Sequence, residues 1–399
     1  MEDHEYESLS ALLRTVDPPP TSVSVDAILD AGRRGARRRR VMATAAAASG
    51  IAIVLFGAVG AVALTRQGTQ APPSTASHKV STTPTAIPSV TDPNAANCTI
   101  QQLPSPPGAM GDMMAADPTG RFQAGQTDLS DGNQGKPVLW TDGVPTLLTV
   151  PKAIMDTTYS INAVSSNGDL ALSTASSAYR YHDGKFTKLS RLAGFSNNAP
   201  SGIAPNGDIV GWVDSDGSAF AAVVWPADQP GSVRKLATPH GRSAEAMAID
   251  ADGAIGGSLG DGGAPFVWSA NGQGHELAVP SGYQGGMVFS LSGDWAVGWV
   301  GVKGSTQVVG ARWNLATGNV NVYADQDEAL AVNAHGDFVG GLGDSTGYLF
   351  RDDTFKDLPG PAYGSEVTPR SISADGKTIA GTAYSASSNA GSPNVIWHC

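Results

Sequence analysis

One structural unit recurs seven times between residues 98 and 399, and this repetition restricts the possible folds more than any other feature of the sequence. When the copies are aligned on the glycine of their first turn, successive glycines lie 48, 39, 46, 40, 43 and 40 residues apart. Such a period indicates a repeat architecture in which each unit packs against its neighbours. The seven glycines are Gly120, Gly168, Gly207, Gly253, Gly293, Gly336 and Gly376.

Each copy contains four short strand signals. The first is small and apolar, the second follows a turn, the third ends on an aromatic residue, and the fourth is polar and closes on Leu or Val. Four antiparallel strands in about 43 residues form one blade of a β-propeller. No stretch keeps an apolar period of 3.6 residues, which excludes helical solenoids. The aromatic positions are Trp140, Tyr181, Trp225, Trp268, Trp313, Phe350 and Trp397.

The first two strands of a copy are separated by Asn-Gly or Asp-Gly. Examples are Asn167-Gly168, Asn206-Gly207, Asp252-Gly253 and Asp375-Gly376. These residue types tolerate positive φ, so the pattern predicts tight type I′ hairpins at these turns.

The two ends of the repeat region complete each other. The seventh copy stops after its third strand, at Cys399, whereas residues 98–104 match the fourth strand of the sixth copy, residues 353–359. In this alignment Cys399 and Cys98 take the positions of Asp352 and Asp353, which are adjacent in a hairpin turn. The sequence therefore predicts an all-β, seven-bladed β-propeller that is closed by an N-terminal strand and a Cys98–Cys399 disulfide.

The predicted disulfide would join residues about 300 apart. In the chain-entropy model such a link contributes about 4–5 kcal/mol to the stability of the folded state. The alternative is two free thiols at a sheet edge. The chain has no other cysteine, and two cysteines at the ends of one domain suit an oxidising compartment.

The N-terminal part has three segments: a basic stub (1–40), an apolar segment (41–65) and a Pro/Ser/Thr-rich linker (66–97). Residues 41–64 carry no charge, and 24 helical residues span about 36 Å, enough to cross a hydrocarbon core of ~30 Å. The arginine cluster just before it places the N-terminus in the cytoplasm and the repeats outside. A cleaved signal peptide is the alternative, but a 40-residue leading region is long for one.

The linker composition predicts a disordered stalk. In the stub, Leu9, Leu12, Leu13 and Val16 form a stripe at helical spacing. This short helix would either dock onto a cytoplasmic partner or be mostly disordered.

The repeat resembles the HAF family of extracellular propeller-like repeats, through PFVWSANG, HEL and EAMAIDADGAIGG between residues 245 and 277. The resemblance covers about 300 residues and implies the fold, but it transfers no site. The His-Ala-Phe that names the family is replaced here, for example by Pro265-Phe266-Val267. The stub, anchor and stalk look like those of actinobacterial membrane proteins, including some sigma-factor regulators.

Few sequence features point to chemistry. Residues 98–399 hold 16 basic and 28 acidic residues, which argues against nucleic acid as a partner. The G-x-S-x-G match at 343–347 joins two strands of one blade, so it is interpreted as a hairpin loop. Two Asp-x-Asp-Gly stretches, at 214–217 and 250–253, lack the remaining calcium ligands and are interpreted as turns. The seven histidines are scattered, and no metal or cofactor is predicted.

The mouth of the central channel is the usual ligand site of a propeller. Aligning the repeats places four polar residues at the heads of the innermost strands and one arginine two positions further in. These candidate ligand-binding residues are Asp112, Ser160, Glu245, Glu328 and Arg370. They would meet a cationic or polar ligand, or they form a solvated rim.

Three functions are compatible with this organisation. The favoured one is a membrane-anchored binding or interaction module whose partner is an extracellular or envelope protein, a peptide or a glycan. The second is a transmembrane regulator of the anti-sigma type, with the propeller as sensor. The third is a propeller hydrolase or lyase, which the fold permits but does not imply.

Overall fold

The computed structural model describes residues 84–87, 95–106, 111–127, 135–155, 157–175, 177–215, 220–260, 263–341, 347–360, 366–384 and 394–399. All strands among the described residues belong to one compact unit, Ala43–Cys399. The predicted stub helix (9–16), the apolar segment 41–65 and Ser345 lie outside the described residues. Within those residues, no helix has the length and apolar character needed to cross a membrane.

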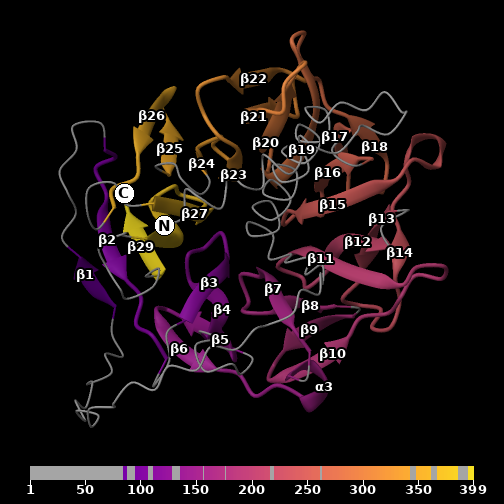
Figure 1. Ribbon diagram of the computed structural model, residues 1–399, viewed down its shortest axis with the longest axis vertical. Coiled ribbons are helices and arrows are strands. Elements are labelled where there is room, and N and C mark those ends of the chain that lie inside the picture. The colour runs from indigo at the N-terminus through magenta and orange to yellow at the C-terminus, as the bar shows by residue number, and fades with distance from the viewer. Residues whose placement is uncertain are drawn as a thin grey trace, which may run out of the picture. The chain divides into compact units, whose positions relative to one another are not determined.

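Seven antiparallel sheets follow one another around a ring, which confirms the predicted seven-bladed β-propeller (Figure 1). Blade one is β3 (Gly111–Ala116), β4 (Phe122–Thr127), β5 (Pro137–Thr141) and β6 (Val144–Leu147). Blade two is β7 (Tyr159–Val164), β8 (Leu170–Thr174), β9 (Ala178–His182) and β10 (Lys185–Lys188). Blade three is β11 (Asn197–Ile203), β12 (Ile209–Asp214), β13 (Phe220–Trp225) and β14 (Arg234–Lys235).

The remaining sheets continue the ring. Blade four is β15 (Ala244–Ile249), β16 (Ile255–Leu259), β17 (Ala264–Trp268) and β18 (Gly274–Glu276). Blade five is β19 (Tyr283–Ser292), β20 (Trp295–Val302), β21 (Val308–Asn314) and β22 (Val320–Tyr323). Blade six is β23 (Ala329–Val332), β24 (Phe338–Gly340), β25 (Tyr348–Arg351) and β26 (Thr354–Asp357). Two short helices, α3 (Lys152–Met155) and η1 (Pro239–Gly241), connect blades one to two and three to four.

Blade seven contains both ends of the repeat region, as predicted. Its strands are β27 (Glu366–Ile372), β28 (Thr378–Tyr384), β29 (Asn394–His398) and, from the N-terminal side, β2 (Thr99–Gln102). Ile100 pairs with Trp397 as Phe355 pairs with Phe350 in blade six. Cys98 and Cys399 therefore take the two turn positions, and their sulfurs are bonded at 2.05 Å.

The end of the predicted stalk takes part in the sheet. Strand β1 (Thr85–Ile87) pairs antiparallel with β2 and forms a fifth strand of blade seven (Figure 1). Ala96 also donates its backbone N–H to the Asp357 carbonyl of blade six, at 2.7 Å. This differs from a free stalk up to residue 97. The physical reason is that β2 alone would leave a row of edge hydrogen-bonding groups, which β1 covers.

The turn chemistry differs from the expectation of type I′ hairpins at the first turn. Asn167 does not have positive φ, whereas Gly168 does, at +82°. The Gly168 N–H donates to the Ser165 carbonyl, and the Ser165 N–H donates to the Asp169 carbonyl. These two backbone bonds close a three-residue loop that ends on a left-handed glycine. Type I′ geometry occurs instead between the third and fourth strands, where consecutive residues have positive φ, as at Asp142-Gly143.

Buried tryptophans on the third strands join neighbouring blades. Each indole N–H donates to a backbone carbonyl two residues beyond the fourth strand of the preceding blade. The pairs are Trp140–Pro104, Trp225–Ser190, Trp268–Ala237, Trp313–Ala278 and Trp397–Pro359, at 2.7–2.8 Å. This repeated bond explains why the third strand so often ends on tryptophan, because a buried indole needs an acceptor.

We expect Trp268→Phe to lower the free energy of unfolding by about 0.5–1.5 kcal/mol, because the hydrogen bond that the buried indole donates to the Ala237 carbonyl is lost. Urea denaturation followed by circular dichroism measures this change. Trp299→Phe is the matched control, since Trp299 is half-buried and its indole makes no hydrogen bond with the described residues. An equal loss in both variants would contradict the role assigned to the indole bond.

Candidate functional site

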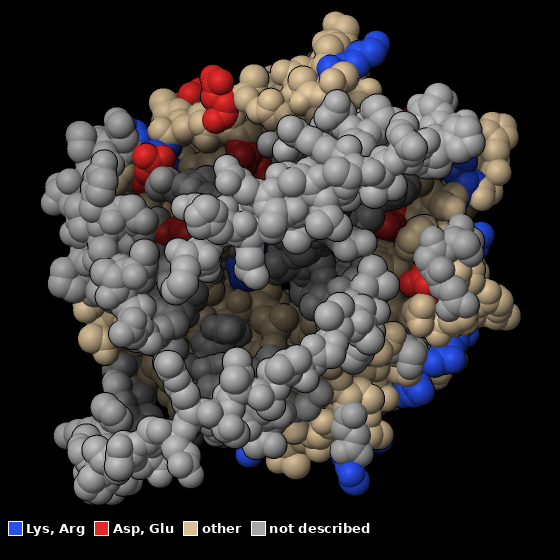
Figure 2. Space-filling view, in the orientation of Figure 1, with Lys and Arg blue, Asp and Glu red and all other residues tan. Residues whose placement is uncertain are grey.

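A cavity of about 70 Å³ lies at the axis of the propeller, where the innermost strands meet. Five of the seven innermost strands contribute to its wall, and Figure 2 shows a hollow near the centre of the ring with basic atoms in its wall. The lining residues are Ser201, Met247, Phe289, Leu330, Thr368, Pro369 and Arg370. Four of the seven lining residues are apolar, and the other three supply one guanidinium group and two hydroxyl groups.

A β-bulge on every innermost strand directs these side chains. Between Ala246 and Ala248, for example, the register with β16 shifts by one residue, which leaves Met247 as the extra residue. A bulge re-aims a side chain that would otherwise alternate between the two faces of the sheet. The extra residues of blades one to seven are Met114, Asn162, Ser201, Met247, Phe289, Leu330 and Arg370. Five of these line the cavity.

Glycines on the second strands permit the bulges. Gly257 lies opposite Ala246, and a Cβ there would overlap the carbonyl oxygen of Glu245. In blade five, Gly298 lies opposite Val288, and a Cβ there would overlap the carbonyl oxygen of Met287. Gly211, Gly340 and Gly381 repeat this relation in blades three, six and seven. In these five blades the two backbones approach too closely for a side chain, whereas blade two has Leu172 opposite its bulge.

Four of the five candidate residues occupy one level of the propeller. Asp112, Ser160, Glu245 and Glu328 each lie two residues before the bulge of their strand. Ser160, Glu245 and Glu328 do not line the cavity. Arg370 is itself the bulge residue of β27 and does line it. The structure thus brings Arg370 together with bulge residues that the sequence analysis did not select.

Glu328 is the most unusual candidate electrostatically. The residue is 7% exposed, and burial raises the pKa of its carboxyl to about 7, with a further contribution from the nearby Asp327 charge. Tyr348 holds this segment by donating its hydroxyl to the Asp327 carbonyl at 2.8 Å. The Glu328 carboxyl can therefore gain or lose a proton near neutral pH, unlike an ordinary glutamate.

Ser201 offers an available polar group in the cavity wall. The residue is 7% exposed, and its hydroxyl has no hydrogen-bond partner among the residues described by the structure. A buried hydroxyl without a partner is uncommon in a folded protein. It is therefore suited to bind a polar atom of a ligand that enters the cavity.

The structure explains one of the two Asp-x-Asp-Gly stretches without calcium. Asp250 accepts hydrogen bonds from the backbone N–H groups of Asp252 and Ala254, at 3.0 and 2.9 Å. It acts as a turn former, as interpreted from the sequence. Within the described part of the chain, no group of three or more His, Cys, Asp or Glu side chains is arranged to hold a metal ion.

The fold places this chain among the seven-bladed β-propellers. No protein-family model matches the sequence, and no curated protein matches it. Solved structures match this chain in fold, at low sequence identity. An oligogalacturonate lyase from Vibrio parahaemolyticus has a TM-score of 0.54 at 11% identity, with 79% of this chain and 97% of that chain covered.

Two further structures show the range of the likeness. An oligogalacturonate lyase in complex with manganese has a TM-score of 0.56 at 12% identity, with 80% of this chain and 98% of that chain covered. A virginiamycin B lyase from Staphylococcus aureus has a TM-score of 0.46 at 16% identity, covering 76% and 99%. The two oligogalacturonate lyase structures, with TM-scores of 0.54 and 0.56, support the fold alone, and no substrate or residue role is carried over from any of the three.

Proposed function

We propose that this chain is a membrane-anchored, extracytoplasmic β-propeller that acts as a binding module. In this proposal, residues 41–65 form the transmembrane anchor and residues 98–399 the exported propeller. The axial cavity receives one side chain or terminal group from an extracellular or envelope partner. A protein or peptide partner fits this cavity better than a freely diffusing small molecule.

The size and lining of the axial cavity are the observations that carry the proposal. Among the described residues it measures about 70 Å³, whereas sites that enclose a small-molecule ligand occupy roughly 300–1,000 Å³. Such a volume accommodates a side chain but not a whole sugar ring or drug-sized ligand. Met247, Phe289 and Leu330 supply an apolar wall, and Arg370 supplies a charge for orientation.

The lining also favours binding over catalysis. General acid–base chemistry needs a titratable group within hydrogen-bond reach of the reacting atoms. The described residues of the wall include no carboxylate, histidine, lysine or cysteine. A fixed guanidinium and a hydroxyl beside apolar side chains are typical of a recognition site.

Three features support the proposed location. The uncharged stretch at 41–64 is long enough to span a bilayer, and the arginine cluster precedes it. The Cys98–Cys399 disulfide suits an oxidising compartment. Strand β1 (Thr85–Ile87) belongs to blade seven, so a stalk shorter than predicted would connect the anchor to the propeller.

We expect the full chain, cross-linked in its native envelope, to capture a specific partner through the cavity. Phe289→Ala and Arg370→Gln should each reduce capture about tenfold or more, the effect of losing one well-placed contact. Asp183→Asn is the control, because Asp183 lies at an exposed turn of blade two. Quantitative mass spectrometry of the captured proteins gives the ratios. Equal capture by all four chains would exclude the cavity as the binding site.

A further inference from the structure

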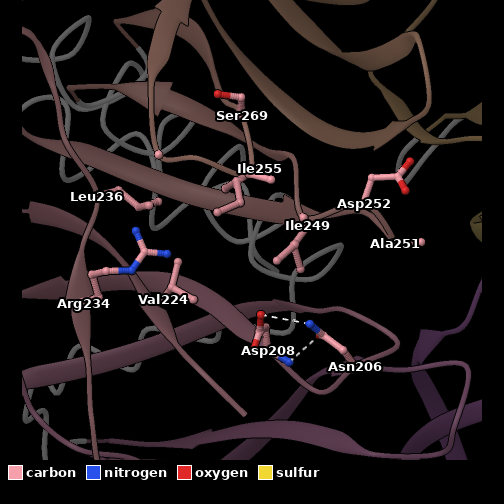
Figure 3. Close-up of a pocket in the computed structure, with 13 residues that line it drawn as sticks. Asn206, Asp208, Val224, Arg234, Leu236, Ile249, Ala251, Asp252, Ile255 and Ser269 are labelled. Atoms are coloured by element: carbon pink, nitrogen blue, oxygen red, sulfur yellow. Dashed lines mark hydrogen bonds between the residues drawn. The ribbon is translucent and has the colours of Figure 1, made fainter. Parts of the chain in front are cut away.

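A second cavity, of about 230 Å³, lies between blades three and four (Figure 3). Its wall includes the apolar side chains of Val224, Leu236, Ile249 and Ile255. Asp208 lies at the start of β12, on the blade-three side of the cavity, beside Asn206. Across it lies the first turn of blade four, which contains Gly253. This cavity is separate from the axial one and shares no lining residue with it.

Blade two shows what fills the corresponding space at another junction. Asp169, which directly precedes β8, pairs with Arg180 of β9 at 2.7 Å. The guanidinium of Arg180 lies against the first turn of blade three, where a Cβ on Gly207 would overlap it. The arginine thus lies between an aspartate of its own blade and the turn glycine of the next blade.

Blade six repeats the arrangement with a different arginine. Asp337 directly precedes β24 and accepts from Arg351 Nε at 3.0 Å. Arg351 also donates through Nη2 to the carbonyl of Gly376, the turn glycine of blade seven. Each of these two blade junctions therefore holds a partly exposed guanidinium group between an aspartate and the turn of the next blade.

Blade five uses an arginine as well, although without the aspartate. Arg312 of β21 donates to the Gly336 carbonyl of blade six at 3.0 Å and stacks on the Trp295 ring at 4.6 Å. Three junctions of the ring, after blades two, five and six, thus hold an arginine against the next turn.

Blade three keeps the aspartate but lacks the arginine. Asp208 directly precedes β12, as Asp169 and Asp337 precede their strands. Val224 takes the position of Arg180, before the third-strand aromatic residue, and Pro226 takes that of Arg351, after it. On the other side, a Cβ on Gly253 would find only Ala270 of its own blade within 4 Å. The space that arginine fills elsewhere is here the cavity.

We propose that this cavity binds a guanidinium group supplied by a ligand. The Asp208 carboxylate already accepts from Asn206 Nδ2 at 3.0 Å and from the Ala227 N–H at 2.7 Å. A carboxylate has about four acceptor positions, so it can also accept from a guanidinium. Planar guanidinium groups match carboxylates in two-bond geometry, and the apolar wall suits the attached methylenes.

Arg234 of the same chain is also one of the residues that line the cavity (Figure 3). It belongs to β14, is exposed, and makes no ion pair with the described residues. Its Nη1 lies 3.6 Å from the Cβ position of Gly272, on the β17–β18 turn of blade four. Arg234 therefore lies at the edge of the cavity, where it can pair with an anionic group carried by the same ligand.

The test uses N-ethylguanidinium as the probe and ethylammonium as the charge control, with the full chain and ligand-observed NMR. We expect saturable N-ethylguanidinium binding with a dissociation constant on the order of millimolar, because the site is partly exposed. Asp208→Asn should weaken this binding about tenfold. Val224→Arg places the missing arginine in the cavity and should abolish it, with an unchanged or raised melting temperature.

Three controls keep the result interpretable. Asp183→Asn, at an exposed turn of blade two, should bind as the wild type does. Arg234→Gln should retain binding, and binding that appears in this variant alone would show that Arg234 already fills the site and overturn the proposal. Equal binding of ethylammonium, or an unchanged affinity in Asp208→Asn, would also overturn it.

Two larger probes identify the source of the guanidinium. The blocked peptide acetyl-Gly-Arg-Gly-amide represents an arginine side chain of a protein partner, and free L-arginine represents an amino acid. Tighter binding of the peptide than of N-ethylguanidinium would assign the site to a protein partner. Tighter binding of L-arginine, lost in Arg234→Gln, would assign it to the free amino acid.

Discussion

Replacing both cysteines by serine is expected to lower the free energy of unfolding by about 5 kcal/mol, the chain-entropy value for a loop of about 300 residues. The disulfide joins Cys98 and Cys399 at the turn position of blade seven. Without it, no covalent bond joins the two ends of the ring. They are then held by the ladder between β2 and β29, which has four residue pairs, and by single hydrogen bonds such as that from the Leu103 N–H to the Asn394 carbonyl at 2.8 Å. Urea denaturation under non-reducing conditions, followed by tryptophan fluorescence, measures the loss.

The control for this experiment is a reductant. Reduction of the wild type should reproduce the double variant, whereas the same treatment of the double variant should have no further effect. An unchanged urea midpoint in the double variant would show that the disulfide does not stabilise ring closure.

The second large effect is a pH dependence that originates at Glu328. Burial raises the pKa of this carboxyl from 4.5 to about 7. Between these values the folded chain keeps a proton that the unfolded chain has lost, so stability falls as the pH rises through this window. The loss amounts to about 3 kcal/mol by pH 7.5, at 1.36 kcal/mol per pKa unit.

Glu328→Gln should remove this dependence, because glutamine carries no titrating proton. The variant is expected to match the wild type near pH 4 and to exceed its stability by up to about 3 kcal/mol above pH 7. Thermal unfolding across this pH range provides the measurement. The matched control is Glu366→Gln, at an exposed position of β27, which should follow the wild-type profile. A parallel profile for Glu328→Gln would show that this carboxyl is not the source.

The fold could be predicted because its signals are local and repeated. Seven turn glycines, seven aromatic third-strand ends and the match of residues 98–104 to the fourth strand of blade six defined the blades and their closure. The pairing of Ile100 with Trp397 confirms the alignment to the residue. Strand β1 was missed because three residues, Thr85–Ile87, are too few to show an alternating pattern.

The axial site could be predicted only in part. A bulge moves one residue, such as Met247 or Phe289, relative to the alternation of its strand. Because both faces of an innermost strand such as β11 are buried, the sequence pattern does not reveal the shift. The glycines opposite the bulges, such as Gly257, were a visible signal whose reason became clear only from the close backbone contact.

The high pKa of Glu328 and the cavity beside Asp208 depend on three-dimensional surroundings. The four rim residues look alike in an alignment, yet Glu328 is buried whereas Glu245 is half-buried. The absence of an arginine beside Asp208 becomes meaningful only when Arg180 and Arg351 are seen to fill the same space in other blades. The cavity is recognised by comparing the same position in different blades, and the residue type at one position does not reveal it.

Disulfide mapping of the chain isolated from its native membrane fraction, with free thiols trapped before lysis, tests ring closure and the anchor together. We expect one linked pair of peptides, which contains Cys98 and Cys399, in a chain that still carries residues 41–65. Recovery of both cysteines as alkylated thiols would contradict ring closure by a disulfide in an oxidising compartment. Recovery of a chain that begins after residue 65 would contradict the proposed anchor.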